Sequence, residues 1–148
     1  MVSEPSDRFG SFGAGEGQFI GPYSVTCNAE GNIYVAEWNN NRVQVFDRNK
    51  QFLFKFGTKG PGNGEFNDPS NVIFNRKTNQ FVVSDSWNHR IQIFDDKGVF
   101  INTFGREGAG DGEFKHPRGI AVDKEGNYLV AESNNHRIQV FDSSQVWV

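Results

Sequence analysis

Three stretches of eleven residues are nearly the same: EWNNNRVQVFD at 37–47, DSWNHRIQIFD at 85–95 and ESNNHRIQVFD at 132–142. The first starts 48 residues before the second, and the second starts 47 residues before the third. Prolines and Phe-Gly pairs recur at intervals of 47 and then 48 residues, at Pro22, Pro69 and Pro117 and at Phe9, Phe56 and Phe104. A fixed period of 40 to 50 residues indicates an array of similar structural units.

Each unit contains four short runs rich in β-branched and aromatic residues, separated by turn residues. In the first unit these runs are SVTCN (24–28), IYVAE (33–37), RVQVFD (42–47) and FLFKFG (52–57). A glycine-rich loop, GTKGPGNGEFNDP (57–69), leads to the next unit. Four strands per unit at this period predict an all-β fold, a β-propeller built from four-stranded antiparallel blades.

Composition narrows the class of protein. The 148 residues include fifteen Phe and seventeen Gly, and the formal charge of −3 gives no general attraction to nucleic acid or to acidic membranes. A single cysteine allows no intrachain disulfide framework, and no apolar run approaches the roughly 20 residues of a membrane span. We therefore expect a soluble cytoplasmic protein that does not interact with membranes.

The stretch GEFKHPRGIAVDKEGNYLVAESNNHRIQVFD (112–142) resembles the NHL repeat, and the resemblance extends over residues 7–148. It implies a propeller, commonly of six blades, like the C-terminal propeller of tripartite-motif ubiquitin ligases and related regulators. Several of these relatives bind RNA through a markedly basic surface, and some NHL-like propellers are metal-dependent lyases.

The phase of the repeats predicts how the chain assembles. Residues 1–148 are expected to hold three repeats, at 7–53, 54–101 and 102–148, with one fourth strand divided between QVWV (145–148) and DRFG (7–10). Three blades would leave apolar faces uncovered, so we expect two copies to close head to tail as a six-bladed ring. The expected junction residues are Asp7, Arg8, Phe9, Val146, Trp147 and Val148. A natural fragment or an engineered half of a longer chain is the competing interpretation.

The repeated charges are predicted to be structural. Arg42, Arg90 and Arg137 each follow an acidic residue by five positions, namely Glu37, Asp85 and Glu132. A guanidinium has five donors in a planar fork, which suits it to tie the loop between the second and third strands to a carboxylate or to carbonyl groups.

No catalytic residues, metal site or cofactor are predicted. The three histidines, His89, His116 and His136, do not supply the three or four ligands that zinc takes. Cys27 aligns with Phe74 and Val122, which indicates a core position. There is no nucleophile motif of the GxSxG type, and the glycine-rich loops lack the Lys-Ser or Lys-Thr of a phosphate-binding loop.

In a propeller, the loops between strands two and three and those leading to the next blade emerge on one face. The candidate binding residues on this face are Trp38, Asn39, Asn41, Trp87, His89, Arg106, Lys115, His116, Arg118 and His136. Arg106, Lys115, His116 and Arg118 form the expected positive cluster, but acidic residues outnumber basic ones in the glycine-rich loops. The leading hypothesis is a non-catalytic module for a protein or peptide partner; the alternatives are a reader of single-stranded or stem-loop RNA and a half-propeller scaffold without a ligand.

Overall fold

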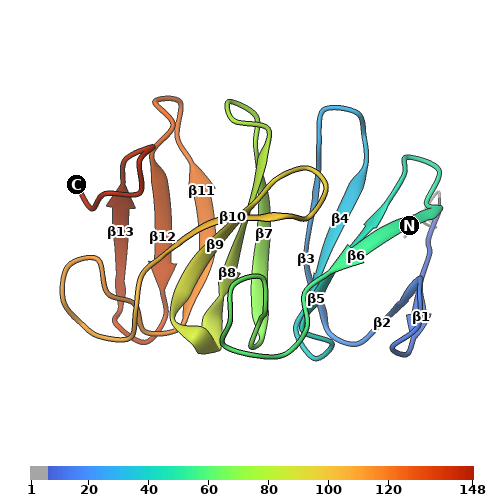
Figure 1. Cartoon of the computed structure of the whole chain (residues 1–148), viewed down its shortest axis with the longest axis horizontal. Coiled ribbons are helices and arrows are strands. Elements are labelled where there is room, and N and C mark those ends of the chain that lie inside the picture. The colour runs from blue at the N-terminus through green and yellow to red at the C-terminus, as the bar shows by residue number, and fades with distance from the viewer. Residues whose placement is uncertain (1–6) are drawn as a thin grey trace, which may run out of the picture.

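The computed structural model of the chain describes residues 7–148 and is almost entirely β-structure (Figure 1). Three antiparallel sheets stand side by side in a row, each following the order of the chain. Sheet 1 contains β3 (Pro22–Cys27), β4 (Ile33–Glu37), β5 (Arg42–Phe46) and β6 (Phe52–Phe56). Sheet 2 contains β7 (Pro69–Asn75), β8 (Gln80–Asp85), β9 (Arg90–Phe94) and β10 (Phe100–Phe104). Sheet 3 contains β11 (Pro117–Val122), β12 (Tyr128–Glu132) and β13 (Arg137–Phe141).

The expected all-β, antiparallel architecture is confirmed, with small differences at the strand ends. β3, β7 and β11 each begin at the repeated proline, two residues ahead of the apolar run, and a register shift separates that proline from the rest of the ladder. The proline is tolerated because these strands lie at the edge of their sheets. Two further elements were not expected: a parallel pair of two-residue strands, β1 (Ser11–Phe12) and β2 (Gln18–Phe19), and a 3-10 turn, η1 (Ser86–Asn88).

The core lies between the sheets, because each sheet is apolar on both sides where it has neighbours. Tyr34 of sheet 1 stacks on Phe81 of sheet 2 with ring centroids 3.6 Å apart. Val82 and Ile91 of sheet 2 belong to a second cluster with Tyr128 of sheet 3. Burial of such side chains on both faces of a sheet contributes about 1.5 to 3 kcal/mol each, so sheet 2 is the most strongly held element.

The repeated Phe-Gly pairs connect neighbouring sheets at their outer strands. Phe56 at the end of sheet 1 packs on Phe94 of sheet 2 at 4.9 Å, and Phe104 of sheet 2 packs on Phe141 of sheet 3 at 5.0 Å. The glycine after each phenylalanine has a positive φ, +97° at Gly57, and a Cβ there would lie 2.4 Å from the Phe66 ring. Only glycine fits this conformation and this close approach.

Across residues 7–148, the structure contains no helix with the length and apolar character needed to cross a membrane.

Candidate functional site

Six loops gather along one edge of the row of sheets, the lower edge in Figure 1. Three are the short turns between the second and third strands of each sheet, at 38–41, 86–89 and 133–136. The others are the glycine-rich segments that precede each sheet, at 13–21, 57–68 and 105–116. We call this edge the loop face.

A buried carboxylate at the start of each short turn accepts hydrogen bonds that fix the turn. Glu37, Asp85 and Glu132 are 0%, 0% and 2% exposed. Each accepts a hydrogen bond from the Nε of an arginine five residues later, at 2.6 Å for Arg42, 2.8 Å for Arg90 and 2.6 Å for Arg137. Each also accepts from an asparagine and a glutamine side chain, Asn40 and Gln44, Asn88 and Gln92, or Asn135 and Gln139. These carboxylates are fully engaged in the fold.

The arginines extend the same network into the glycine-rich loops. In sheet 2, the second terminal nitrogen of Arg90 donates to the carbonyl oxygens of Gly62 at 2.7 Å and Glu65 at 3.0 Å. Arg42 and Arg137 make corresponding contacts with the loops before sheets 1 and 3. The short turn and the long loop of each sheet are therefore fixed to one another by charge-assisted hydrogen bonds.

The same network gives opposite pKa shifts in neighbouring sheets. Burial raises the pKa of Asp85 above its usual value, although Asn67, Asn88 and Arg90 donate to it. Burial also raises the pKa of Glu132, but hydrogen bonds led by Arg137 outweigh this effect and leave the pKa below its usual value. Asp85 lies in the middle sheet and Glu132 in the last sheet, which explains the stronger desolvation at Asp85.

Two of the predicted binding residues face the junctions between sheets. Asn41 is 8% exposed, and its side-chain oxygen accepts a hydrogen bond from the backbone N–H of Asp68 at 2.8 Å. His89 occupies the same position in sheet 2, and its Nδ1 accepts from the backbone N–H of His116 at 3.2 Å. Their polar atoms are used within the chain, so neither belongs to the surface that we propose for a partner.

Aromatic rings on the loop face lie near the starts of β3 and β11. Trp87 is 50% exposed and packs edge-on against His116 at 4.7 Å. Trp38 contacts Tyr23, which is 58% exposed, at 4.5 Å, and the guanidinium of Arg118 lies 5.2 Å from the centre of the Trp38 ring. We call these five residues, Tyr23, Trp38, Trp87, His116 and Arg118, the aromatic patch.

Tyr23 is the member of the patch that sequence reasoning missed. It follows Pro22 directly, as Ser70 follows Pro69 and Arg118 follows Pro117. Because Arg118 was a candidate for the loop face, the same position in the first repeat was the signal for Tyr23.

The four residues of the expected positive cluster do not act as one group, because Arg106 pairs with a carboxylate. Burial lowers the pKa of His116, and nearby His89, Arg118 and Lys115 lower it further. The centres of the His89 and His116 rings are 4.6 Å apart. Arg106 instead pairs with Glu113 at 3.1 Å. Glu107 lies 3.9 Å from the Nε2 of His89, so two carboxylates, Glu107 and Glu113, stand at the same edge as Arg106.

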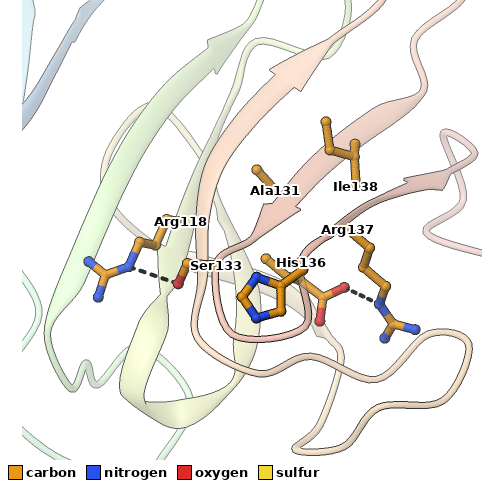
Figure 2. Close-up of a pocket in the computed structure, with 7 residues that line it drawn as sticks. Arg118, Ala131, Ser133, His136, Arg137 and Ile138 are labelled. Atoms are coloured by element: carbon orange, nitrogen blue, oxygen red, sulfur yellow. Dashed lines mark hydrogen bonds and ion pairs between the residues drawn. The ribbon is translucent and has the colours of Figure 1, made fainter.

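Asn39 and His136 complete the predicted set. Asn39 is exposed on the turn of sheet 1. His136 lies at the open side of sheet 3, beside a pocket shown in Figure 2. The residues that line this pocket are Arg118, Ala131, Glu132, Ser133, His136, Arg137 and Ile138. Within residues 7–148, no three His, Cys, Asp or Glu side chains converge in a manner that would hold a metal ion. Cys27, which the repeat alignment predicted to be a core residue, is exposed, so that prediction is wrong.

Comparison with known protein families gives two matches. The profile of the NHL repeat matches residues 114–141, and a profile described as a 6-bladed β-propeller matches residues 18–91. The second match covers 74 of the 148 residues, half of the chain.

Curated relatives contain similar segments. Protein brain tumor of Drosophila melanogaster is 49% identical over 53 residues, which are 36% of this chain and 5% of that protein. B-box type zinc finger protein ncl-1 of Caenorhabditis elegans is 46% identical over 78 residues, 53% of this chain and 9% of that protein. The chain therefore spans less than a tenth of the length of either relative.

Solved structures share the fold at low sequence identity. A streptogramin B lyase superposes with a TM-score of 0.68 at 17% identity, covering 86% of this chain and 39% of the lyase. The hydrazine synthase of Kuenenia stuttgartiensis also gives 0.68, at 16% identity, covering 86% of this chain and 34% of that chain. These likenesses concern the fold alone. Because the 6-bladed β-propeller profile matches half of the chain, the chain belongs to that β-propeller family, and it contains an NHL repeat at residues 114–141.

Proposed function

We propose that the chain is a non-catalytic interaction module that binds a peptide segment of a partner protein through the aromatic patch. The observation that carries this proposal is the exposure of Trp87, at 50% on a turn that the Arg90 network holds in place, and of Tyr23, at 58% at the start of β3. Large amphipathic rings on a rigid support are typical of binding hot spots, because they bury much surface and lose little conformational freedom.

The state of the ionisable groups supports a binding role. Asp85 has a raised pKa, which is often a sign of a reactive carboxyl group. However, its side chain is fully buried and is held by Asn88, Arg90 and Gln92. A substrate on the loop face would have no access to it, and its pKa is explained by the packing of the middle sheet.

The charge of the loop face favours a peptide as the ligand. Arg118 belongs to the patch and Lys115 lies near it, but the carboxylates of Glu107 and Glu113 stand at the same edge, and Glu113 pairs with Arg106. A surface with little net charge gains little from phosphate groups. Aromatic rings beside asparagine and serine side chains suit a polypeptide with an apolar anchor and free backbone groups.

Selection of a phage-displayed random peptide library against the chain tests this proposal. The repeats supply matched substitutions, because Asn39 and Asn134 stand where Trp87 stands and Ser70 stands where Tyr23 stands. Trp87→Asn and Tyr23→Ser are each expected to weaken an enriched synthetic peptide at least about tenfold. Val99→Gln, on an exposed turn at the opposite edge where the first repeat has Gln51, is the control. Enriched peptides that bind both patch variants as tightly as the unsubstituted chain would overturn the proposal.

One observation favours RNA as the second candidate. Arg118 stacks over Trp38 next to His116 and Lys115, and an arginine on an aromatic ring is a surface on which an unpaired base can stack. A pool of single-stranded and stem-loop oligonucleotides would then bind in a salt-sensitive manner, and Arg118→Ser, the residue of the second repeat, would abolish binding. A scaffold without a ligand would bind neither pool, and the patch variants would alter stability alone.

We further propose that the binding form is a homodimer, in which two copies complete a ring of six sheets. Such a ring would present two aromatic patches on one side. A cytoplasmic location belongs to the same proposal, because a chain with one cysteine has no intrachain disulfide that needs an oxidising compartment.

A further inference from the structure

Residues 7–10 occupy the position of a fourth strand from a sheet that would precede sheet 1. Phe9 packs on Phe46 at 5.1 Å, just as Phe56 packs on Phe94 at 4.9 Å. A Cβ on Gly10 would lie 2.5 Å from the Phe19 ring, as one on Gly57 would lie 2.4 Å from the ring of Phe66, in the loop before sheet 2. The contact between a fourth strand and the following sheet is therefore already formed at the start of the chain.

A polar contact also shows that residues 7–10 correspond to a fourth strand. The side chain of Asn102, in the fourth strand of sheet 2, donates to Gln145 in the turn after sheet 3 at 2.7 Å. The positions 95 residues earlier are Asp7 and Lys50, which also contact each other. Residues 7–10 differ from a complete fourth strand in one respect, because they are not part of a strand ladder.

Sheet 3 lacks most of a fourth strand. In sheet 1, Val43 pairs with Phe56 and Gln44 pairs with Lys55 across β5 and β6. The corresponding positions of β13 are Ile138 and Gln139, and no residue among 7–148 pairs with them on that side. Trp147 bridges Phe141, and Val148 donates to Val140 at 3.0 Å, so the pairing of a fourth strand begins there but does not reach Ile138.

The two outer faces of the row are apolar and carry the residues that are buried elsewhere. Ile138 is 66% exposed, whereas its counterparts Val43 and Ile91 are fully buried between sheets. On the opposite outer face Val25 is 65% exposed, whereas its counterpart Val72 is 1% exposed. The outer face of sheet 3 thus has the apolar residues that elsewhere pack against the next sheet. The outer face of sheet 1 has the apolar residues that elsewhere pack against the preceding sheet.

The pocket in Figure 2 marks the place of the missing contact. At the junction of sheets 2 and 3, the equivalent surface of sheet 2 receives the chain just before β11. There His89 accepts from the N–H of His116, and Ser86 donates to the carbonyl of Pro117 at 2.6 Å. In the pocket, His136 and Ser133 stand in the positions of His89 and Ser86.

The segment that would fill this pocket is present at the other end of the row. Gly21 and Pro22 occupy the repeat positions of His116 and Pro117, and Gly21 has a φ of +65° where His116 has +53°. Pro22, Tyr23 and Val25 line a shallow pocket of their own on the exposed side of β3.

We propose that the outer face of sheet 3 binds the outer face of sheet 1 of a second copy of this chain, and that residues 7–10 of that copy supply the rest of the fourth strand of sheet 3. The repeat sets the register, with Phe9 of one copy opposite Ile138 of the other. The N–H of Gly21 donates to His136 across this contact. Two such contacts, related by a twofold axis, close a ring of six sheets. This assignment rests on the proposed function, in which the homodimer is the binding form.

Cross-linking tests the register directly. The test variant carries Phe9→Cys and Ile138→Cys together with Cys27→Val. Valine is chosen because the third repeat has Val122 at the position of Cys27. A short bis-thiol cross-linker is expected to convert this variant to covalent dimers, because directly opposed residues in a ladder lie about 5 Å apart. An intrachain link is excluded by the fold, since β1 and β13 lie at opposite ends of the row (Figure 1). Each single-cysteine variant is the control, and equal cross-linking of a single-cysteine variant would overturn the register.

Sedimentation over a concentration series tests the contact itself. Ile138→Glu is expected to raise the dissociation constant of the dimer at least about a hundredfold, because each of two apolar contacts would enclose a carboxylate. Ile138 is exposed in the single chain, so this variant is expected to retain its circular dichroism spectrum. Val99→Glu, at a 58% exposed position where the first repeat has Gln51, is the matched control.

A chain that remains a monomer at tens of micromolar, or an association unchanged by Ile138→Glu, would overturn the proposal. Trp87→Asn separates it from the proposed binding function, because that substitution is expected to leave the dimer intact. A dimer that binds no peptide refutes peptide binding alone. A monomer that binds peptide through Trp87 refutes the dimer, here and as the binding form, and leaves peptide binding by the aromatic patch standing.

Discussion

Sheets 2 and 3 contain nearly the same residues in different surroundings. Ile91 and Ile138 stand at the same position of RIQIFD and RIQVFD, yet Ile91 is fully buried and Ile138 is 66% exposed. Sheet 2 is covered on both sides, whereas sheet 3 is covered on one side only. The comparison teaches that equal sequences in a repeat protein do not have equal energies, because each unit is stabilised by its neighbours.

The buried carboxylates show the same difference electrostatically. Asp85 and Glu132 have matching hydrogen-bond partners, but the pKa of Asp85 is raised by burial and that of Glu132 is lowered by its donors. The neighbouring arginines follow this trend, since the side chain of Arg90 is 11% exposed and that of Arg137 is 27% exposed.

Removal of the carboxylates is expected to give the largest difference between the two sheets. Asp85→Ala should lower the free energy of unfolding by about 3 to 5 kcal/mol, because it leaves the Arg90 guanidinium buried without its partner. Glu132→Ala should cost clearly less, since water reaches part of Arg137. Urea unfolding of both variants measures this, and equal losses would contradict the argument from coverage.

Truncation of the paired isoleucines is the next test. Ile91→Ala should cost about 2 to 5 kcal/mol because it leaves a cavity between sheets 2 and 3. Ile138→Ala should cost less than about 0.5 kcal/mol at dilutions where the chain is monomeric. Its cost should grow with protein concentration if a second copy covers this face, whereas a cost independent of concentration would speak against that covering.

A smaller, pH-dependent effect is expected at the junction of the two sheets. The pKa of His116 is lowered in the folded chain, first by burial and then by His89, so the unfolded chain binds this proton more readily. Stability from this group is complete above the ordinary histidine pKa, near 6.5, and is lost as the pH falls toward the folded value. The urea midpoint should therefore drop between pH 7.5 and 5.5, and should drop less in His116→Gly, which carries the residue of the first repeat.

The smallest effect concerns the titration of the carboxylates. By NMR of carboxyl carbons, Asp85 should titrate above its usual value of 3.8 and Glu132 below its usual value of 4.5. For Glu132, the stabilisation is present above pH 4.5 and is lost as the pH falls; for Asp85, the ionised form at higher pH is the less favourable one. Covering of sheet 3 by a second copy should raise the pKa of Glu132 toward its usual value, and an identical titration in monomer and dimer would show that its surroundings do not change.

The repeat made most strands predictable, because three aligned copies of each strand reveal its pattern and its turns. β4, β5, β8 and β9 lie where their apolar runs predict. The aligned prolines did not reveal that the edge strands start two residues early, since that depends on pairing with the neighbouring strand.

The candidate site was less predictable, because side-chain direction depends on the neighbouring sheet. Asn41 and His89 were selected as polar loop residues, but their acceptor atoms bind backbone N–H groups across the junctions. Tyr23 was overlooked because it lies in the entry to a strand, and only the packing of Trp38 places it on the loop face.

The sequence by itself determined the all-β architecture, the period of the sheets and the presence of an NHL repeat, since these follow from local patterning that recurs at 47 and 48 residues. The tertiary structure alone decided which copy of each residue is buried, which carboxylate has a raised pKa and which aromatic rings remain exposed. The reason is physical. Burial and desolvation are properties of the surroundings, and three units of similar sequence have different surroundings when they stand in a row.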